Sequence, residues 1–328
     1  MRFSRKTITQ TLLCLTLGFS SNLLALDEDI LTQYKNNGIK NITKILDQKL
    51  TDTTYWKNYL KNKDTNFGYI ESYINLLICN KAQSKLTLYT KINGTYTLRK
   101  GYSAFTGKLK GDKKKEGDLK TPVGVYNLIR KLEKVDSFYG PMAFVTSYPN
   151  LYDKYQGKTG QGIWIHGLPT DQERDEFTKG CIAIKNQSLE CLNKDIAINK
   201  TLLIINEAQP HKVDKTTLST ILAQLYSWRY SWIYNDLNHY LDFYDAKFKR
   251  FDGMDKKAFS NYKKRIFSRN ETKTILFTNL NVIPYPDKNE TYKITFNEQY
   301  KTKNFKFQGN KILIVQFVDN KIKIITEK

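Results

Sequence analysis

Apolar residues recur at two different spacings along this chain, and each spacing predicts a different kind of element. Between residue 27 and about residue 75 they return every three or four positions, as at Leu31, Tyr34 and Ile42, which predicts helices. We extend this helical expectation to residues 69–77. About fifty helical residues make a marginal core by themselves, so we expect them to pack on the next domain or on a second copy of the chain.

From Lys85 onward apolar and polar residues alternate, which predicts β-strands. Asn93-Gly94 separates two such runs and is a strong signal for a two-residue hairpin turn, because both residues tolerate a positive φ. Further strands are expected at 123–129, 143–148, 162–166, 181–184 and 201–205, with a short helix at 186–192. This segment is therefore predicted to be a mostly-β domain.

Gln209-Pro210-His211 interrupts the pattern and is interpreted as a linker. An aromatic stretch at 218–251 then returns to helical spacing. Strands are expected again at 274–283, 291–300, 304–308 and 311–325. Helices followed by antiparallel strands are typical of an α+β domain. The expected organisation is a leading segment 1–25, a helical region 26–78, a mostly-β domain 79–207 and an α+β domain 208–328.

The leading segment has the features of a signal peptide. Arg2, Arg5 and Lys6 precede an apolar stretch at 11–19, and Ala25 closes a candidate cleavage site. The apolar stretch is shorter than the roughly 20 residues that a membrane-spanning helix needs. We expect an exported protein. An uncleaved anchor is the alternative, because Leu23 stands where a small residue is usual.

The formal net charge of +21 predicts affinity for polyanions. In an exported protein these would be wall polymers, anionic lipids or acidic peptides. The lysines are spread through the chain among Asp and Asn residues and form no continuous basic arm. Nucleic acid is therefore not an expected partner.

Cleavage would leave Cys79, Cys181 and Cys191, which is too few cysteines for a disulfide framework. A single bridge between Cys181 and Cys191 is compatible with the sequence and would block either thiol. The chain carries no CxxC or HExxH motif, so no metal site is expected.

His166 precedes Cys181 by 181 − 166 = 15 residues, and it is one of only 3 histidines in the chain. A thiol becomes a strong nucleophile when an imidazole takes its proton, so the pair suggests acyl-transfer chemistry. The competing interpretation is a buried cysteine and a loop histidine with structural roles only. Spacing alone does not decide between them.

Three ordered motifs surround this pair: Thr121-Pro122-Val123-Gly124-Val125-Tyr126, then Gly162-Ile163-Trp164-Ile165-His166-Gly167, then Thr178-Lys179-Gly180-Cys181-Ile182. Together they resemble the L,D-transpeptidase catalytic domain, the YkuD family, over roughly residues 80–207. The resemblance implies that Cys181 is the nucleophile and His166 its base, with the Gly167 carbonyl fixing the imidazole tautomer. It also implies an oxyanion or substrate-binding region at Thr178, Lys179 and Gly180. Trp164 could line the cleft or pack under the sheet.

One residue departs from the family pattern: Ala183 stands two positions after the cysteine, where cross-linking members commonly carry Arg. The absence of that guanidinium favours hydrolysis over joining of two peptides.

The whole layout resembles the cell-shape-determining L,D-carboxypeptidases of curved and helical Gram-negative bacteria. In that group a helical N-terminal region mediates dimerisation and the C-terminal domain is NTF2-like. The chain is therefore expected to be an α+β multidomain protein with a mostly-β YkuD-like domain between a helical region and an NTF2-like domain.

The resemblance implies a periplasmic enzyme that trims peptidoglycan stem tetrapeptides to tripeptides and needs no cofactor. It also implies a homodimer formed through the helical region, and it leaves open an unknown ligand or protein at the C-terminal domain. Two alternatives stand beside it: an L,D-transpeptidase that forms 3–3 cross-links or attaches proteins to the wall, and a non-catalytic wall-binding scaffold.

Overall fold

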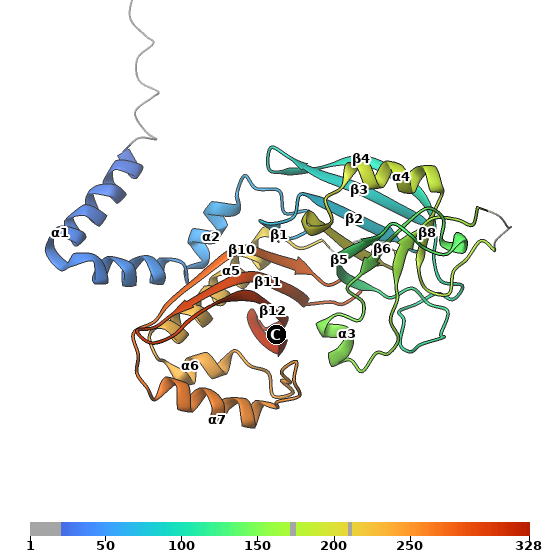
Figure 1. Ribbon diagram of the computed structural model, residues 1–328. Coiled ribbons are helices and arrows are strands. Elements are labelled where there is room, and N and C mark those ends of the chain that lie inside the picture. The colour runs from blue at the N-terminus through green and yellow to red at the C-terminus, as the bar shows by residue number, and fades with distance from the viewer. Residues whose placement is uncertain (1–20, 171–174, 209–211) are drawn as a thin grey trace, which may run out of the picture. The chain divides into compact units, whose positions relative to one another are not determined.

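The computed structural model describes residues 21–170, 175–208 and 212–328 (Figure 1). The signal-peptide expectation therefore lies largely outside the described residues. The chain divides into two compact units, one ending at Lys49 and one running from Leu50 to Lys328. The first contains helix α1 (Ser21–Lys49), which kinks at Gly38, where φ is +70°. None of the described helices is long and apolar enough to cross a membrane.

A closed β-barrel forms the first part of the second unit. Its strands follow one another around the barrel as β2 (Asn75–Asn80), β3 (Lys85–Ile92), β4 (Thr95–Phe105), β8 (Ile182–Ile184), β7 (Trp164–His166), β6 (Ala143–Thr146), β5 (Gly124–Leu132) and β9 (Thr201–Asn206). The predicted turn at Asn93-Gly94 joins β3 to β4, with both residues at positive φ. The barrel interior holds apolar side chains from opposite strands, among them Leu77, Tyr126 and Ile165.

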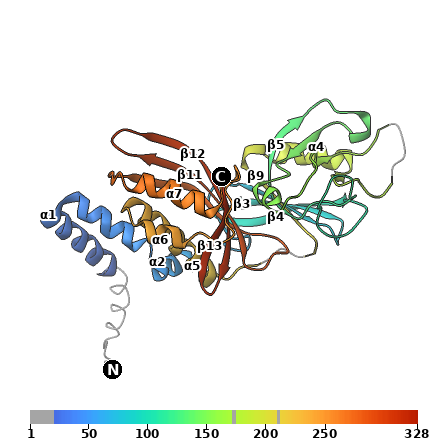
Figure 2. The ribbon, with the colours of Figure 1, turned by 90° about the horizontal axis from the view of Figure 1, so that it is seen from below.

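The C-terminal domain is an antiparallel sheet with helices packed on one face (Figures 1 and 2). The sheet order is β1 (Tyr69–Ile70), β10 (Thr274–Pro284), β11 (Thr291–Lys301), β12 (Lys306–Val318) and β13 (Lys321–Glu327). The helices are α5 (Lys215–Ile233), α6 (Leu237–Asp242) and α7 (Lys256–Phe267). Aromatic residues of the helices and the sheet form a common core, in which Trp228 and Tyr240 are fully buried.

Helix α2 (Thr53–Leu60) and strand β1 precede the barrel in sequence but belong to the C-terminal domain. Trp56 of α2 stacks on Tyr226 of α5 with ring centroids 5.2 Å apart. Strand β1 pairs with β10, and the Asn281 side chain accepts hydrogen bonds from the Glu71 and Ser72 amides. Helix α2 thus packs on the C-terminal domain rather than on the mostly-β domain that follows it in sequence.

Three expectations about local structure were wrong. Residues 69–77 form β1 and the start of β2 instead of a helix. Because β2 is buried on both faces between β3 and β9, its continuous apolar run carries no strand periodicity. Within the segment 218–251 that was predicted to be helical, the observed helices α5 and α6 end at Asp242. Helix α7 was not predicted. The last two strands meet at Asp319-Asn320, both at positive φ, rather than between residues 308 and 311.

The barrel is flanked by the short helices α3 (Leu151–Tyr155) and α4 (Asn186–Asp195) and by two turns of 3-10 helix, η1 (Ser137–Tyr139) and η2 (Ile198–Lys200). Helix α4 matches the helix expected at 186–192. A reciprocal capping box between Asn150 and Asp153 stabilises the N-terminus of helix α3. It contacts strands β12 and β13 of the C-terminal sheet.

Candidate active site

The predicted nucleophile and base lie on two neighbouring strands of the barrel. His166 is the last residue of β7, and Cys181 immediately precedes β8. The two strands are parallel, with Ile165 opposite Ile182 and His166 opposite Ala183. Because side chains alternate across a strand, Ile165 and Ile182 enter the barrel core, whereas His166 and Cys181 share its outer face.

The Cys181 thiol is half-buried and has polar neighbours on the backbone. The Trp164 amide donates to Sγ at 3.5 Å, and the thiol donates to the Gly162 carbonyl at 3.4 Å. The Trp164 amide favours the thiolate, which is the reactive form, whereas the Gly162 carbonyl favours the protonated thiol. Cys79 offers a contrast, because burial raises the pKa of its thiol to about 12 and makes it inert.

All three cysteines of the described chain are free thiols. No bridge joins Cys181 to Cys191, so the disulfide that the sequence allowed is not formed.

The His166 imidazole is held by the residue that follows it. Nδ1 lies 2.7 Å from the Gly167 carbonyl oxygen. Since a carbonyl only accepts, this contact places the proton on Nδ1 and makes Nε2 the ring nitrogen that can accept a proton from the thiol. The Tyr139 ring packs edge-on against the imidazole at 5.0 Å, and His166 is only 1% exposed. This is the geometry that the resemblance implied for Gly167.

Asn186, the first residue of α4, holds the turn that contains the Gly167 carbonyl through two hydrogen bonds to Leu168. The sequence did not indicate this residue. Its Oδ1 accepts from the Leu168 amide at 2.8 Å, and its Nδ2 donates to the Leu168 carbonyl at 3.1 Å. A Cβ at Gly167 would lie 2.1 Å from Oδ1, so only glycine fits beside Asn186. The Gly167 amide also donates to the Tyr139 carbonyl at 2.9 Å. The one signal in the sequence was an Asn at the predicted start of a helix.

Thr178 and Gly180 shape the loop that presents the cysteine. The Thr178 hydroxyl donates to the Cys181 carbonyl at 2.7 Å and accepts from the Gly180 amide at 3.0 Å. Gly180 has a φ of +140°, and a Cβ there would lie 2.9 Å from the Lys120 carbonyl oxygen. The Gly180 amide is thus engaged within the loop. Both residues act on the cysteine through the backbone, and any role at an oxyanion stays a prediction.

A cavity of about 490 Å³ opens in front of the pair. It is lined by Phe138, Tyr139, His166, Asp175, Phe177, Thr178, Lys179 and Cys181. Lys179 is exposed and contributes a positive charge to this space, and its role as a substrate-binding residue stays a prediction. Trp164 packs against Tyr139, with ring centroids 5.2 Å apart, which favours the packing interpretation. Phe138 and Tyr139 of η1 and Phe177 belong to none of the three sequence motifs, so the sequence did not indicate that they line the cavity.

Ala183 is fully buried, opposite His166 on one side and opposite Phe105 of β4 on the other. The small side chain at this position therefore fits a closed space between strands. Among the residues that the structure describes, no group of three His, Cys, Asp or Glu could hold a metal ion. The cavity brings together a thiol and an imidazole in a fixed tautomer, with the exposed Lys179 and Asp175 also in its lining, which suits acyl transfer.

The part of the chain that holds this site matches a known family of domains. Residues 74–205 match the L,D-transpeptidase catalytic domain (YkuD), and residues 220–328 match the Cds6 C-terminal NTF2-like domain. The crystal structure of the helical cell shape determining protein Pgp2 from Campylobacter jejuni is 43% identical, with a TM-score of 0.79 over 85% of this chain and 99% of that one. The chain belongs to the L,D-transpeptidase (YkuD) family. Its C-terminal domain is NTF2-like.

Two further relatives lie at greater distance from this YkuD-family chain. The structure of Bdellovibrio bacteriovorus Bd1075 is 27% identical, with a TM-score of 0.65 over 78% of this chain and 92% of that one. The putative L,D-transpeptidase YafK of Escherichia coli K12 is 35% identical over 112 residues, which is 34% of this chain and 42% of YafK. The match thus spans less than half the length of that curated relative.

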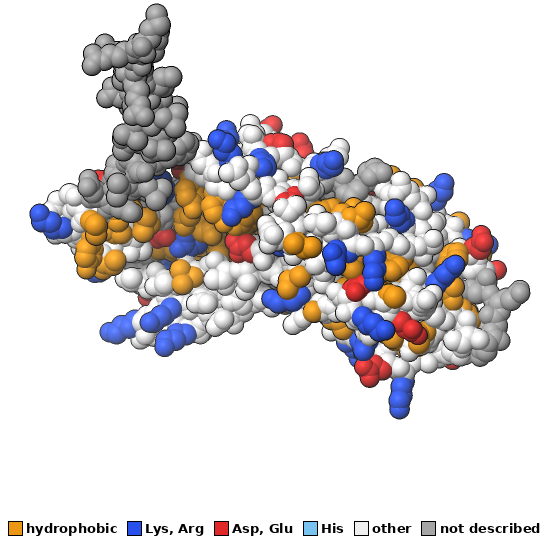
Figure 3. Space-filling view, turned by 90° about the horizontal axis from the view of Figure 1, so that it is seen from above, with side chains coloured by type: hydrophobic (Ala, Val, Ile, Leu, Met, Phe, Trp, Pro, Cys, Tyr) orange, Lys and Arg blue, Asp and Glu red, His pale blue; other side chains and the backbone are white. Residues whose placement is uncertain are grey.

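The expected multidomain architecture is confirmed: a helical N-terminal region, a mostly-β YkuD domain and an NTF2-like domain. The family also gives the chain a wall-related enzyme domain. On the face shown in Figure 3, Lys and Arg side chains are scattered among neutral and apolar surface instead of gathering in one block. This agrees with the dispersed charge expected from the sequence.

Proposed function

We propose that this protein is a peptidoglycan L,D-carboxypeptidase, which removes the terminal D-Ala from stem tetrapeptides and leaves tripeptides. The observation that carries the proposal is the fixed imidazole: the Gly167 carbonyl holds Nδ1 at 2.7 Å beside the cavity that Cys181 lines. Similarity to a cell shape determining protein over 99% of that protein's chain supports a substrate in the wall.

The reaction follows from the two side chains. His166 Nε2 takes the proton of the Cys181 thiol, and the sulfur attacks the carbonyl carbon of the diamino acid that precedes D-Ala. When the tetrahedral intermediate collapses, the C–N bond breaks and the imidazolium gives its proton to the leaving amine of D-Ala. His166 then takes a proton from water, and the hydroxide attacks the thioester. The tripeptide leaves with a new carboxylate, and the thiol regains its proton.

Lys179 provides a candidate recognition group for the substrate's end. A carboxypeptidase must distinguish a free C-terminal carboxylate from a continuing chain, and an ammonium at the edge of the cavity suits that task. The change Lys179→Gln should raise KM several-fold and leave kcat nearly unchanged, because the contact is the same in ground state and transition state. Steady-state kinetics on a disaccharide tetrapeptide measures both. A fall in kcat with an unchanged KM would contradict this role for Lys179.

One feature supports hydrolysis over peptide joining. Ala183 leaves the position of the family's usual arginine without a guanidinium, and a residue with the volume of Arg does not fit a fully buried site between β7 and β4. The transpeptidase alternative predicts cross-linked dimers when the protein is given tetrapeptide donors and acceptors. The scaffold alternative predicts no turnover.

Location and assembly belong to the same proposal. The expected signal segment would deliver the enzyme to the periplasm, where peptidoglycan is accessible. Helix α1 exposes Leu31, Tyr34 and Ile39, each more than half exposed, which suits pairing with a second copy. Light scattering of residues 26–328 and of a form lacking residues 26–49 tests this. A dimer that persists without the helix would contradict it.

Incubation of the purified protein with a defined disaccharide tetrapeptide tests the activity. We expect free D-Ala and the disaccharide tripeptide in equal amounts, and neither product from Cys181→Ala. The change Cys191→Ala removes a thiol outside the cavity and should retain full activity, so it is the matched control. Activity that survives in Cys181→Ala would overturn the assignment.

A further inference from the structure

A second cavity, of about 450 Å³, lies where the barrel's helix α3 meets the outer face of the NTF2-like sheet. Residues of both domains line it, among them Asn127 and Lys154 from the barrel side and Lys293, Ile314, Thr326 and Lys328 from the C-terminal domain. It is separate from the catalytic cavity, with which it shares no lining residue.

The strand pattern places this cavity on the sheet face opposite the helices. Ile314 and Thr326 are register partners on β12 and β13, and both line the cavity. Their neighbours in sequence, Leu313 and Glu327, point the other way, to the helix-covered core, where Glu327 accepts from Tyr244. The cavity therefore uses a surface that the NTF2-like core does not.

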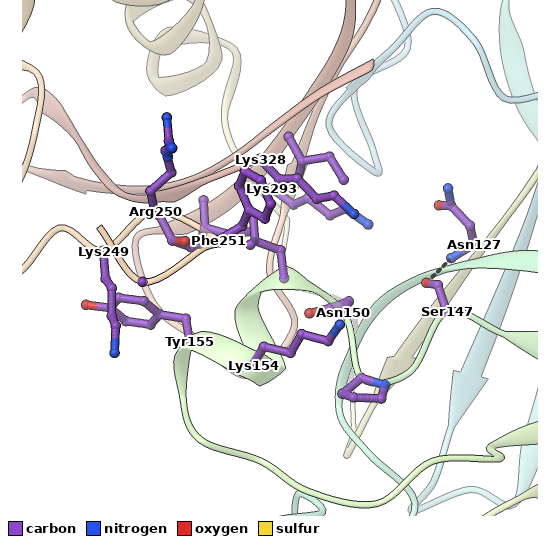
Figure 4. Close-up of a pocket in the computed structure, with 16 residues that line it drawn as sticks. Asn127, Ser147, Asn150, Lys154, Tyr155, Lys249, Arg250, Phe251, Lys293 and Lys328 are labelled. Atoms are coloured by element: carbon purple, nitrogen blue, oxygen red, sulfur yellow. Dashed lines mark hydrogen bonds between the residues drawn. The ribbon is translucent and has the colours of Figure 1, made fainter. Parts of the chain in front are cut away.

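The lining is strongly cationic. It carries five Lys and Arg side chains and no Asp or Glu side chain. Arg250 is paired with Asp252, and in Figure 4 its guanidinium points away from the other side chains. Lys293 and Lys328 come from the sheet and Lys154 from α3, so positive groups approach from both domains (Figure 4). Like charges that line one cavity repel one another, and an anion between them removes that repulsion.

Lys293 marks the cavity as a built site. Its side chain is only 5% exposed, and its ammonium donates to the Val125 carbonyl at 3.0 Å. Burying an ammonium against a neutral carbonyl is costly. Burial lowers the pKa of this lysine to about 8, with only the more distant Asp153 opposing the shift. A bound carboxylate would supply the counter-charge that the carbonyl lacks.

We propose that this interdomain cavity binds an organic anion with two or more carboxylates. Its lining combines lysine ammoniums with the Asn127 side-chain amide and with apolar side chains such as Leu151 and Ile312. Separated point charges around an apolar floor suit carboxylates spaced along a carbon skeleton. Lysine ammoniums also bind phosphate, so the apolar floor is the feature that favours carboxylates on a carbon skeleton over inorganic phosphate. The ligand is either a free small polycarboxylate or a carboxylated peptide, and the site is independent of the reaction proposed for Cys181.

Isothermal titration of the full chain with citrate and with a disaccharide tripeptide tests the site. The double variant Lys154→Gln/Lys328→Gln removes two exposed cations of the cavity. The control Lys257→Gln/Lys321→Gln removes two exposed cations outside it and changes the net charge equally. We expect at least one of the two probes to bind wild type and the control alike, with a Kd at least 10-fold higher in the cavity variant. Thioester-forming activity should be equal in all three proteins.

The arms of this experiment separate the sources of the anion. Citrate binding alone indicates a free small molecule, and tripeptide binding alone or more tightly indicates a carboxylated peptide. The proposal is overturned if neither probe binds wild type, if the control pair weakens binding as much as the cavity pair, or if inorganic tripolyphosphate binds more tightly than both probes. Thermal melting of each variant verifies that it is folded.

Discussion

At the scale of single residues, the site depends on backbone groups that fix two side chains. Gly167 supplies a carbonyl to His166, Gly162 and Trp164 contact the thiol, and Thr178 ties the loop to the Cys181 carbonyl. The sequence predicted the pair and Gly167 because those residues belong to compact motifs. It did not indicate Asn186 or Tyr139, since they reach the histidine through tertiary contacts that leave no local pattern.

Asn186 is a positioning residue for the imidazole. Asn186→Ala removes both hydrogen bonds to Leu168 and frees the Gly167 carbonyl to turn away. We expect kcat to fall about 10- to 100-fold with KM little changed, since a small misplacement of a catalytic group has an effect of this size. Steady-state kinetics across pH measures it. Asn186→Asp keeps the acceptor for the Leu168 amide and should recover part of the loss; equal kcat in wild type and the Ala variant would contradict the role.

At the scale of elements, prediction succeeded where local chemistry is sufficient. The hairpin at Asn93-Gly94 and the short strands on both sides of the site follow from alternation and turn residues. Prediction failed for β2, which is buried on both faces, and for α7, whose many lysines between Lys256 and Phe267 hide its apolar stripe. In both cases the deciding contacts come from distant parts of the chain.

The loop before β8 is conformationally constrained at Gly180. Gly180→Ala combines a positive φ with a contact at 2.9 Å to the Lys120 carbonyl oxygen, so it should cost roughly 1–3 kcal/mol in stability and displace the thiol. We expect at least a 10-fold loss of kcat/KM. Gly157→Ala is the matched control, because Gly157 has a positive φ of +71° but no atom within 4 Å of the added Cβ. If the control lost as much activity, general destabilisation would explain the result.

At the scale of the whole molecule, residues 50–328 form one compact unit that contains both the barrel and the NTF2-like domain. Strand β1 leaves the C-terminal sheet a few residues before β2 enters the barrel. The domain content was predictable from motifs and order along the chain. That α2 and β1 belong to the C-terminal domain was not predictable, because the residues that hold them there, such as Trp56 and Tyr226, lie far apart in sequence.

The buried Lys263 gives the fold a characteristic pH dependence. Burial lowers its pKa to about 8 from 10.5, partly opposed by Glu327, and its ammonium lies 4.5 Å from the Trp232 ring centroid. Between these values the unfolded chain binds more protons than the folded one, so stability rises with pH. Urea unfolding should show this rise from pH 7.5 to 9. Lys263→Met should reduce its slope by up to about 1.4 kcal/mol per pH unit, leaving the similar contribution of Lys293. An unchanged slope would contradict the assignment.

The central claim is that Cys181 forms an acyl-enzyme that water resolves. Mass spectrometry of the products made from a disaccharide tetrapeptide in ¹⁸O-enriched water tests it most directly. The account predicts a tripeptide that carries one ¹⁸O in its new carboxylate, together with free D-Ala, and no conversion by Cys181→Ala. Cross-linked dimers without ¹⁸O, or tripeptide formed by the Cys181→Ala protein, would contradict it.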